Sequence, residues 1–287
     1  MYVKLDAKGL GMQVDHVRIP AGKRRVPALV LKPRVLRPDA PCVLWIHGGG
    51  YMLGMKEMVF MSRAVDLVQR FGAVVVAPGY RLSWMAPYPA ALDECYAALV
   101  WMRDHAAELG ANPSQLMVGG ESAGGGLAAS LAMLARDRDE VRLAFQMPLY
   151  PMIDNLDTWS SRDNHAKVWN TRRNHLGWWL YLRGAAQRSD VPAYAAAARQ
   201  TNYAGLPPAY TFVCTAEPFY AETLAFVDAL REAGVQADVD TYEGLYHAFD
   251  MLEPDLPQSV QARERFCERF AWACEHCCAP QDTRYNA

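Results

Sequence analysis

The sequence lacks long hydrophobic runs and an excess of charge of either sign. No apolar stretch approaches the length of a membrane span, and Met1–Asp15 contain no apolar core of signal-peptide length. The formal net charge is -2, and the arginine pairs at 24–25 and 172–173 stand alone. Because phosphate binding requires a concentrated basic face, we expect neither a nucleic acid nor a membrane as a partner.

Cysteine shows no disulfide pattern. The 287 residues contain seven cysteines, an odd number, without an export signal, and this predicts reduced thiols in a cytoplasmic protein. Four of them gather near the C-terminus, at Cys267, Cys274, Cys277 and Cys278. Zinc needs four ligands at matched spacing, and no second Cys-x-x-Cys pair is present. We therefore interpret the group as chance neighbours on the last helix rather than a zinc site, and we expect no metal.

Internal repeats and low-complexity tracts are also missing, and the chain instead alternates strand and helix patterns. The expected strands are Val14–Ile19, Val26–Leu31, Cys42–Ile46, Ala73–Ala77, Gln115–Val118, Leu143–Leu149, Ala209–Cys214 and Ala237–Tyr242. The expected helices are Val59–Phe71, Pro87 to about Leu109, Leu127–Leu134, Asn174–Leu182, Glu222–Ala233 and Gln258 to about Cys277. This alternation predicts an α/β fold with a mostly parallel eight-stranded sheet, opened by an antiparallel hairpin and covered by helices on both faces.

The alternation breaks between the sixth and seventh expected strands. Residues 153–206 are rich in Trp, Asn and Arg, and the stretch is too long for a loop of a compact domain. We interpret it as a helical cap inserted into a catalytic domain made of residues 1–152 and 207–287. Residues 1–13 are a further candidate contributor to the cap.

A glycine-flanked serine separates one strand from the next helix, in Gly120-Glu121-Ser122-Ala123-Gly124. On such a turn, glycine neighbours let the strand and the helix approach, and the serine hydroxyl is presented at the carboxyl end of the sheet. The pattern predicts Ser122 as a nucleophile. A glycine-rich turn in some other α/β fold has the same short signature, so the rest of the chain must decide between the two.

A second glycine-rich stretch, His47-Gly48-Gly49-Gly50, follows an upstream buried strand. A serine nucleophile needs donors for the negative charge that develops on the substrate oxygen. We expect the backbone N–H groups of Gly48, Gly49 and Ala123 to form this oxyanion hole. We interpret His47 as a structural histidine, because the general base is expected after the serine in the chain.

The base and the acid are expected downstream of Ser122, in the order serine, acid, histidine. His247 follows the last expected strand through a short loop, where it can reach the serine from the carboxyl edge of the sheet. The first carboxylate after the strand Ala209–Cys214 is Glu217, and we predict it as the acid. Glu222 is the alternative, but a carboxylate at the start of a helix is also explained by the helix dipole.

Three stretches carry motifs of a known family. They are His47-Gly48-Gly49-Gly50, Tyr80-Arg81-Leu82 with Pro87-Tyr88-Pro89-Ala90-Ala91, and Gly120-Glu121-Ser122-Ala123-Gly124-Gly125. Together they resemble the bacterial hormone-sensitive-lipase-like (family IV) carboxylesterases, and the similarity runs from about Pro41 to His247. The resemblance implies an α/β-hydrolase fold and an enzyme that hydrolyses short-chain acyl esters without a metal or an organic cofactor.

The chain departs from the pattern of that family in three places. The family's acid normally opens an Asp-Pro-Leu or Asp-Pro-Phe segment, and this chain has Glu217-Pro218-Phe219. The Ala-Pro-Glu that follows Tyr-Arg-Leu in the family is Ser83-Trp84-Met85 here, which would add apolar wall to the pocket. Only 46 residues precede His47, fewer than is usual in the family, so we expect the cap to rest mainly on the insertion.

Aromatic and soft side chains lie near the expected mouth of the site. Together they suggest an apolar pocket, as is typical of small-molecule sites, although each of them alone is more typical of the core of a cap. The candidates for the substrate pocket are Tyr51, Trp84, Trp178 and Phe219, with Met52, Trp169 and Trp179 in the same group.

The leading hypothesis is a serine carboxylesterase that works through an acyl-enzyme intermediate on a small-molecule ester. The alternative from another class is a non-catalytic small-molecule receptor on the same fold, which the presence of both Ser122 and His247 argues against. Among enzymes, a deacetylase, an amidase or a lactonase would use the same residues. The last helix is a candidate surface for a homodimer.

Overall fold

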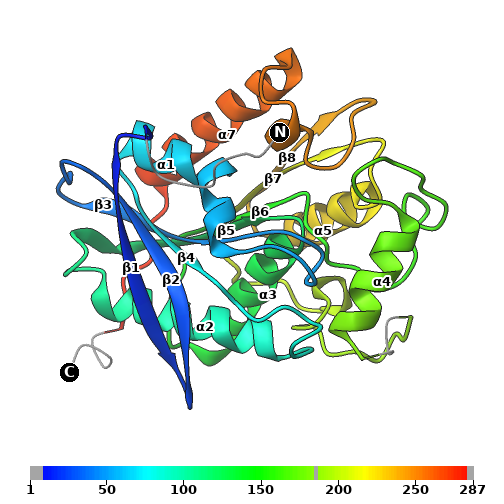
Figure 1. Cartoon of the computed structure of the whole chain (residues 1–287), viewed down its shortest axis with the longest axis horizontal. Helices are drawn as coiled ribbons and strands as arrows, with labels where there is room; N and C mark the ends of the chain where they lie inside the picture. The colour runs from blue at the N-terminus through cyan, green and yellow to red at the C-terminus, as the bar shows by residue number, and fades with distance from the viewer. Residues whose placement is uncertain (1–8, 184–186, 283–287) are drawn as a thin grey trace.

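The computed structural model describes residues 9–183 and 187–282 (Figure 1). Within these residues, eight strands form one sheet in the order β1-β2-β4-β3-β5-β6-β7-β8. The strands are β1 Met12–Ala21, β2 Arg24–Pro33, β3 Ala40–Ile46, β4 Val74–Pro78, β5 Ala111–Glu121, β6 Phe145–Leu149, β7 Ala209–Cys214 and β8 Ala237–Tyr242.

The sheet is antiparallel at one edge and parallel elsewhere. Strand β1 pairs with β2, and β2 with β4, in antiparallel register, whereas the pairs from β4 through β3, β5, β6 and β7 to β8 are parallel. Every residue of β3 and β4 is buried, as expected for continuous apolar strands covered on both faces. The predicted α/β-hydrolase fold, with its mostly parallel eight-stranded sheet, is confirmed.

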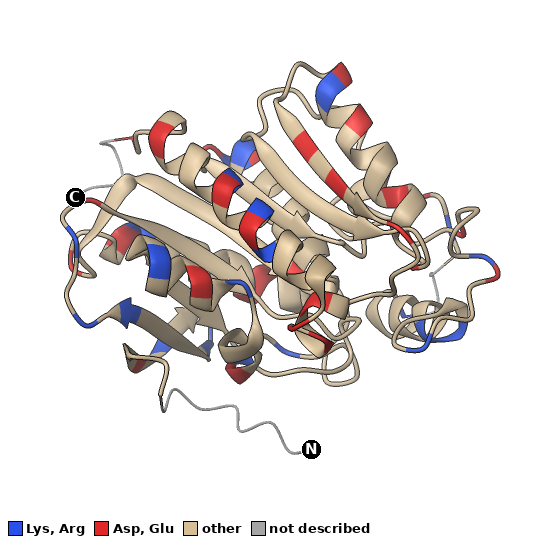
Figure 2. Ribbon diagram, turned by 90° about the horizontal axis from the view of Figure 1, so that it is seen from above, with Lys and Arg blue, Asp and Glu red and all other residues tan. Residues whose placement is uncertain are grey.

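Helices cover both faces of the sheet. Side chains of α2, α3 and α5 belong to one hydrophobic core, and those of α1 and α7 belong to the other. Figure 2 shows lysine, arginine and acidic residues intermixed along the helices and loops. The helices are η1 Lys56–Met61, α1 Ala64–Phe71, α2 Ala90–His105, α3 Ala123–Arg138, α4 Thr171–Tyr181, η2 Ala197–Arg199, α5 Tyr220–Glu232, α6 Phe249–Leu252 and α7 Pro257–His276.

Two helical predictions need correction. The helix expected over Val59–Phe71 is two elements, because the 3₁₀ turn η1 ends at Met61 and α1 starts at Ala64. The hydroxyl of Ser62 donates to the carbonyl of Val59 and accepts from the N–H of Ala64, which competes with the helical bonding pattern. The sequence also gave no sign of α6, since a helix of four residues carries no periodicity.

The segment between β6 and β7 carries α4 and η2 and lies at the opposite end of the sheet from β1 (Figure 1). Asn170 caps α4 by accepting the N–H of Arg173. The rings of Trp178 and Tyr181 are buried against Tyr51, with centroids 5.4 and 4.0 Å away. This segment is therefore packed onto the loop that follows β3.

Of residues 1–13, the structure describes 9–13. The carbonyl of Leu10 accepts from the side chain of Gln69 on α1, and Met12 begins β1. Among the described residues, no helix is both long and apolar enough to cross a membrane.

Candidate active site

Ser122 occupies a strained turn between β5 and α3. Its backbone dihedral angles, φ 59° and ψ -121°, lie in a region that non-glycine residues rarely adopt. Its N–H donates to the carbonyl of Leu149, and its carbonyl accepts from Met152 and Gly126. A Cβ atom on Gly124 would lie 2.0 Å from the carbonyl oxygen of Ile46, so the start of α3 passes β3 too closely for any side chain there. These contacts give the turn the geometry of a nucleophile elbow.

The glycine loop after β3 lies directly against this turn. A Cβ on Gly48 would come within 2.8 Å of the carbonyl oxygen of Glu121 and 3.2 Å of the Ser122 Cβ. Gly49 has φ +116°, and its carbonyl accepts from the N–H groups of Met52 and Leu53. The loop is therefore a tight turn whose backbone borders the serine. The structure also brings Ala123 here, at the first position of α3, where a helix has N–H groups without helical partners.

His47 is buried beside this loop and bonds to it. Its Nδ1 lies 2.8 Å from the carbonyl oxygen of Gly48, which can only accept, so Nδ1 carries the hydrogen. Its ring stacks on Tyr80 with centroids 4.2 Å apart, and the hydroxyl of Tyr80 donates to the His47 carbonyl. Burial lowers the pKa of His47 to about 4. These contacts are those of a neutral structural histidine.

We expect His47 to make the folded state sensitive to mild acid. Its pKa is about 4 when folded and returns to about 6.5 on unfolding, so in this range the unfolded chain binds more protons. Stability should therefore fall by about 3 kcal/mol as the pH drops from about 6.5 to about 4. The variant His47→Asn keeps a donor toward Gly48 and does not titrate. Urea unfolding of both proteins at several pH values should give a shallower acid slope for the variant, and parallel curves would contradict the assignment.

The structure brings Ser122, His247 and Glu217 together in one hydrogen-bonded line. His247 Nε2 lies 2.9 Å from Ser122 Oγ, and His247 Nδ1 bonds to Glu217 Oε2. The three residues follow the carboxyl ends of β5, β8 and β7, which meet at one edge because these strands are parallel. Glu217 is completely buried, and its second oxygen accepts the N–H of Cys214 at 2.9 Å. The carboxylate is thus held in one orientation toward the histidine.

Glu222, the alternative acid, lies elsewhere. Its Oε1 accepts the backbone N–H groups of Ile153 and Asp154, at 2.8 and 3.1 Å, and its Oε2 makes no hydrogen bond within the described residues. Burial raises its pKa well above the usual range. Through these bonds Glu222 holds the backbone directly after Met152, whose own N–H donates to the Ser122 carbonyl.

A cavity of about 320 Å³ opens in front of the serine. Apart from Ser122, His247 and Glu121, its wall is made of glycine, aliphatic, methionine and aromatic residues. The lining residues are Gly48, Gly49, Leu53, Gly54, Met58, Met61, Glu121, Ser122, Tyr150, Val168, Trp169, His247, Ala248, Met251 and Leu252.

The four residues predicted to line the substrate pocket are not in this wall. Tyr51 and Trp178 are buried, and the Tyr51 hydroxyl donates to the Met152 carbonyl. Trp84 is 64% exposed on the loop after β4, as is most of Met85, whereas Ser83 is buried and its hydroxyl donates to the carbonyl of Tyr51. Phe219 is buried behind the site, with its ring 5.0 Å from that of His247. From the wider aromatic group, Trp169 does line the cavity.

Sequence reasoning missed Tyr150 and the three methionines of the cavity wall. Tyr150 directly follows the carboxyl end of β6, and that position was a usable signal, because this edge of the sheet holds the site. Met58 and Met61 lie on η1, and Met251 lies on α6. Both elements are single short turns, and they reach the cavity only through tertiary packing.

This combination defines the class of the protein. A serine on a strand-to-helix turn, a glycine loop beside it and a histidine after the last strand, on this sheet order, are the features of an α/β hydrolase. In agreement, a family model described as "alpha/beta hydrolase fold" matches residues 43–251. The chain belongs to this family, in its hormone-sensitive-lipase-like branch of carboxylic ester hydrolases.

Individual relatives support this membership. Carboxylesterase NlhH of Mycobacterium tuberculosis is 31% identical over 251 residues, which cover 85% of this chain and 77% of that protein. A bacterial heroin esterase superposes with a TM-score of 0.84 at 31% identity, covering 94% of this chain and 85% of the other. Esterase LipW from Mycobacterium marinum gives a TM-score of 0.86 at 28% identity, with coverages of 93% and 83%.

Proposed function

We propose that this protein is a serine carboxylesterase in which Ser122 is the nucleophile, His247 the general base and Glu217 the acid. The observation that carries the proposal is the continuous hydrogen-bonded line from Ser122 Oγ through the two ring nitrogens of His247 to Glu217. A serine hydroxyl attacks an ester only when a base removes its proton, and the base needs an oriented partner for its other nitrogen. The names of the relatives, carboxylesterase and esterase, point to the same chemistry.

In this mechanism His247 accepts one proton and passes it on in each half of the cycle. It takes the proton of Ser122 Oγ as the hydroxyl attacks the ester carbonyl, and it gives that proton to the leaving alcohol. Water then enters, loses a proton to the same nitrogen and attacks the acyl-enzyme. His247 returns that proton to Ser122 Oγ as the bond between Oγ and the acyl group breaks and the acid leaves. Glu217 stabilises the imidazolium that forms in each half of the cycle and holds the ring in its productive tautomer.

The negative charge on the substrate oxygen is stabilised, in this proposal, by the N–H groups of Gly48, Gly49 and Ala123. The proximity of the glycine loop to the Ser122 Cβ supports this role, because an oxyanion must lie within hydrogen-bond distance of both loop and elbow. Loss of one such donor typically lowers kcat by a factor of about 10²–10³.

We further propose that residues 153–206 act as a cap over a site for short-chain acyl esters. Val168 and Trp169 of this segment form part of the cavity wall. The indole of Trp169 packs so closely on the glycine loop that a Cβ on Gly50 would come within 2.0 Å of it. At about 320 Å³ the cavity is near the lower limit of ligand pockets, which span about 300–1,000 Å³, and this supports a small apolar ester.

The expected result of an acyl-length series is a maximum at short chains. Nitrophenyl esters from acetyl to decanoyl are compared by kcat/KM, and activity should fall beyond about eight carbons because the cavity is small and Met58, Met61 and Met251 form part of its wall. The variant Met251→Ala should move the maximum toward longer chains. An unchanged profile in that variant would mean that the acyl group binds elsewhere.

Reaction with an organophosphonate tests the catalytic assignment independently of any substrate. Such probes label an activated serine and leave an ordinary hydroxyl unmodified. We expect stoichiometric labelling at Ser122. An intact, folded protein that resists labelling would contradict the esterase proposal and favour a non-catalytic receptor on the same fold.

A further inference from the structure

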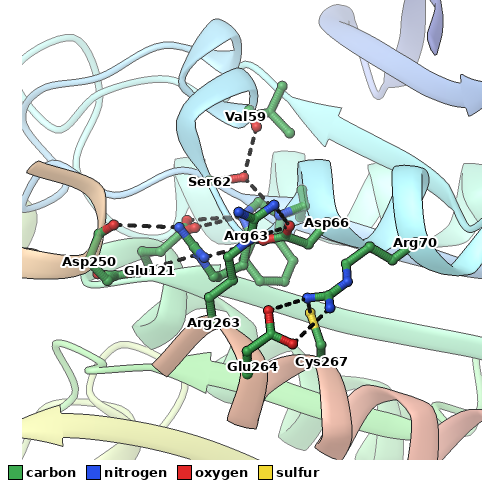
Figure 3. A network of polar contacts seen from close by, with 12 residues as sticks. Val59, Ser62, Arg63, Asp66, Arg70, Glu121, Asp250, Arg263, Glu264 and Cys267 are labelled. Atoms are coloured by element: carbon green, nitrogen blue, oxygen red, sulfur yellow. Dashed lines mark hydrogen bonds and ion pairs between the residues drawn. The ribbon is translucent and has the colours of Figure 1, made fainter. Parts of the chain in front are cut away.

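A cluster of charged residues joins the start of α1 to α7 and to Asp250 of α6 (Figure 3). Its centre is Arg63, the residue just before α1, which is 7% exposed. Its Nη1 donates to Asp66 Oδ2 at 3.2 Å, and its Nε lies 3.4 Å from Asp250 Oδ2. Asp66 also binds Arg263 of α7, whose Nε lies 2.7 Å from Oδ1. One buried guanidinium is therefore shared by two buried carboxylates from different parts of the chain.

Asp250 connects this cluster to the catalytic histidine. It lies three residues after His247, in the short helix α6, and it is completely buried. Its Oδ1 accepts the hydroxyl of Tyr150 at 3.1 Å, and the Tyr150 ring contacts the His247 ring edge to face, with centroids 5.0 Å apart. Ala248, between the two, has the left-handed φ of 59°. A strained turn thus carries the histidine at one end and the buried carboxylate at the other.

The cluster also contacts Glu121, the residue just before Ser122. Both carboxylate oxygens of Glu121 accept the indole N–H of Trp45, at 3.0 and 2.9 Å, and the backbone N–H of Arg63 also bonds to this side chain. Burial, with a smaller effect of Asp250, raises the pKa of Glu121 to about 8, so its carboxyl is mostly neutral at pH 7.

The cluster pairs two guanidinium groups, Arg63 and Arg263, with two carboxyl groups, Asp66 and Asp250. Burial raises the pKa of Asp250, and the charge of Arg63 opposes that rise. The groups that face Asp250 are Arg63, Glu121, Tyr150, Cys214, Tyr242 and His247. The groups that face His247 are Ser122, Tyr150, Glu217 and Asp250. Of the groups around Asp250, Arg63 holds the permanent positive charge, because an arginine side chain does not deprotonate in proteins.

We propose that Arg63 is a positioning residue of the active site. Its guanidinium neutralises Asp250, which anchors the turn that carries His247 and prevents the Asp250 carboxylate from changing the basicity of that histidine. The Nε–Oδ2 approach makes no hydrogen bond and acts through charge, whereas Arg63 Nη2 donates to the backbone carbonyl of Asp250 at 3.5 Å. The inference rests on the proposed esterase mechanism, in which His247 must be neutral to accept the serine proton.

The acid limb of the pH profile of kcat/KM is the range in which activity falls as His247 becomes protonated. Two single substitutions should shift this limb in opposite directions. Arg63→Met leaves the Asp250 carboxylate unbalanced near His247, which favours the imidazolium and moves the limb up by about one pH unit. Asp250→Asn keeps an acceptor for Tyr150 but leaves the guanidinium unbalanced, and it moves the limb down by a similar amount. The double variant has neither charge, and its limb should return to the wild-type position. KM should change by less than about threefold in all three variants.

The double variant also addresses stability. Removing one partner of a buried ion pair is strongly destabilising, whereas removing both is often tolerated, so the double variant should fold even where Arg63→Met does not.

Two further variants serve as comparisons. Arg63→Lys retains a cation and should keep the acid limb near its wild-type position. Part of the kcat should be lost, because lysine lacks the planar guanidinium group with its several N–H donors. Arg70→Met is the matched control on α1, since Arg70 binds the exposed Glu264 and should leave the profile unchanged.

NMR titration of the His247 ring provides a readout that needs no turnover. The ring resonance, assigned by its loss in His247→Gln, should titrate at lower pH in Asp250→Asn than in the double variant. Failure of wild-type hydrolysis and labelling would reject the esterase proposal and leave this titration measurable. The role of Arg63 would be overturned if the wild type, Asp250→Asn and the double variant gave the same His247 titration curve and the same pH profile of kcat/KM. This holds even if kcat falls in the variants, as long as neither curve moves along the pH axis.

Discussion

Replacement of Ser122 by alanine is expected to abolish ester hydrolysis, with kcat/KM falling by a factor of about 10⁴–10⁶. Ser122 Oγ lies 2.9 Å from His247 Nε2, and in the proposed mechanism it forms the bond to the acyl group, so without it no acyl-enzyme can form. Residual activity above the uncatalysed rate would come from the oxyanion hole and binding alone. Nitrophenyl acetate hydrolysis by purified wild-type and variant proteins measures the effect.

A matched control for this prediction is Ser259→Ala. Ser259 is also buried, and its hydroxyl makes no hydrogen bond, so its removal leaves no partner unsatisfied. The control should hydrolyse the ester at the wild-type rate, and both variants should unfold near the wild-type temperature. A folded Ser122→Ala protein with wild-type activity would reject the mechanism as a whole.

Replacement of Glu217 by glutamine is expected to lower kcat by a factor of about 10³–10⁴ while KM changes little. Glutamine keeps the shape of the side chain but has no charge, so it cannot stabilise the imidazolium. It can also present its amide N–H₂ to His247 Nδ1, which would force the ring hydrogen onto Nε2, where the Ser122 proton must be accepted. The measurement is a steady-state comparison over a range of pH.

Glu222→Gln is the control for this second prediction. Both glutamates are fully buried and lie five positions apart, but Glu222 bonds to the N–H groups of Ile153 and Asp154 rather than to the histidine. A glutamine can still accept these bonds through its carbonyl oxygen, so activity should stay within about threefold of wild type. A larger loss in Glu222→Gln than in Glu217→Gln would transfer the role of the acid to Glu222.

Local sequence patterns predicted the framework of the sheet closely. The strands expected over Ala209–Cys214 and Ala237–Tyr242 are β7 and β8 with the same bounds, and the opening hairpin is β1 with β2. The continuous apolar runs at β3 and β4 are typical of parallel strands that are covered on both faces, and both strands are fully buried. The chain order of serine, acid and histidine then placed the candidates for the site, since each of them follows the carboxyl end of a strand.

Predictions for the pocket were weaker, because a cavity wall depends on which face of an element is turned inward. Trp84 and Trp178 were both predicted for the pocket, yet Trp84 is 64% exposed and Trp178 is a buried residue of α4. No local pattern distinguishes an aromatic ring that lines a cavity from one that packs in a core. Met251 was missed for a related reason, since its helix is a single turn formed after a left-handed residue.

The sequence by itself determined the class of fold and the identity of the residues proposed for catalysis, because strand periodicity and glycine-flanked motifs are local properties of the chain. Only the tertiary structure decided between Glu217 and Glu222 as the neighbour of His247, since the two are close in sequence and differ in the direction of their side chains. Likewise, the pairing of Arg63 with Asp250 joins residues far apart in the chain. Residues far apart in the chain meet in this way because parallel strands bring their carboxyl ends to one edge of the sheet. The segments around that edge then place opposite charges next to each other in the interior.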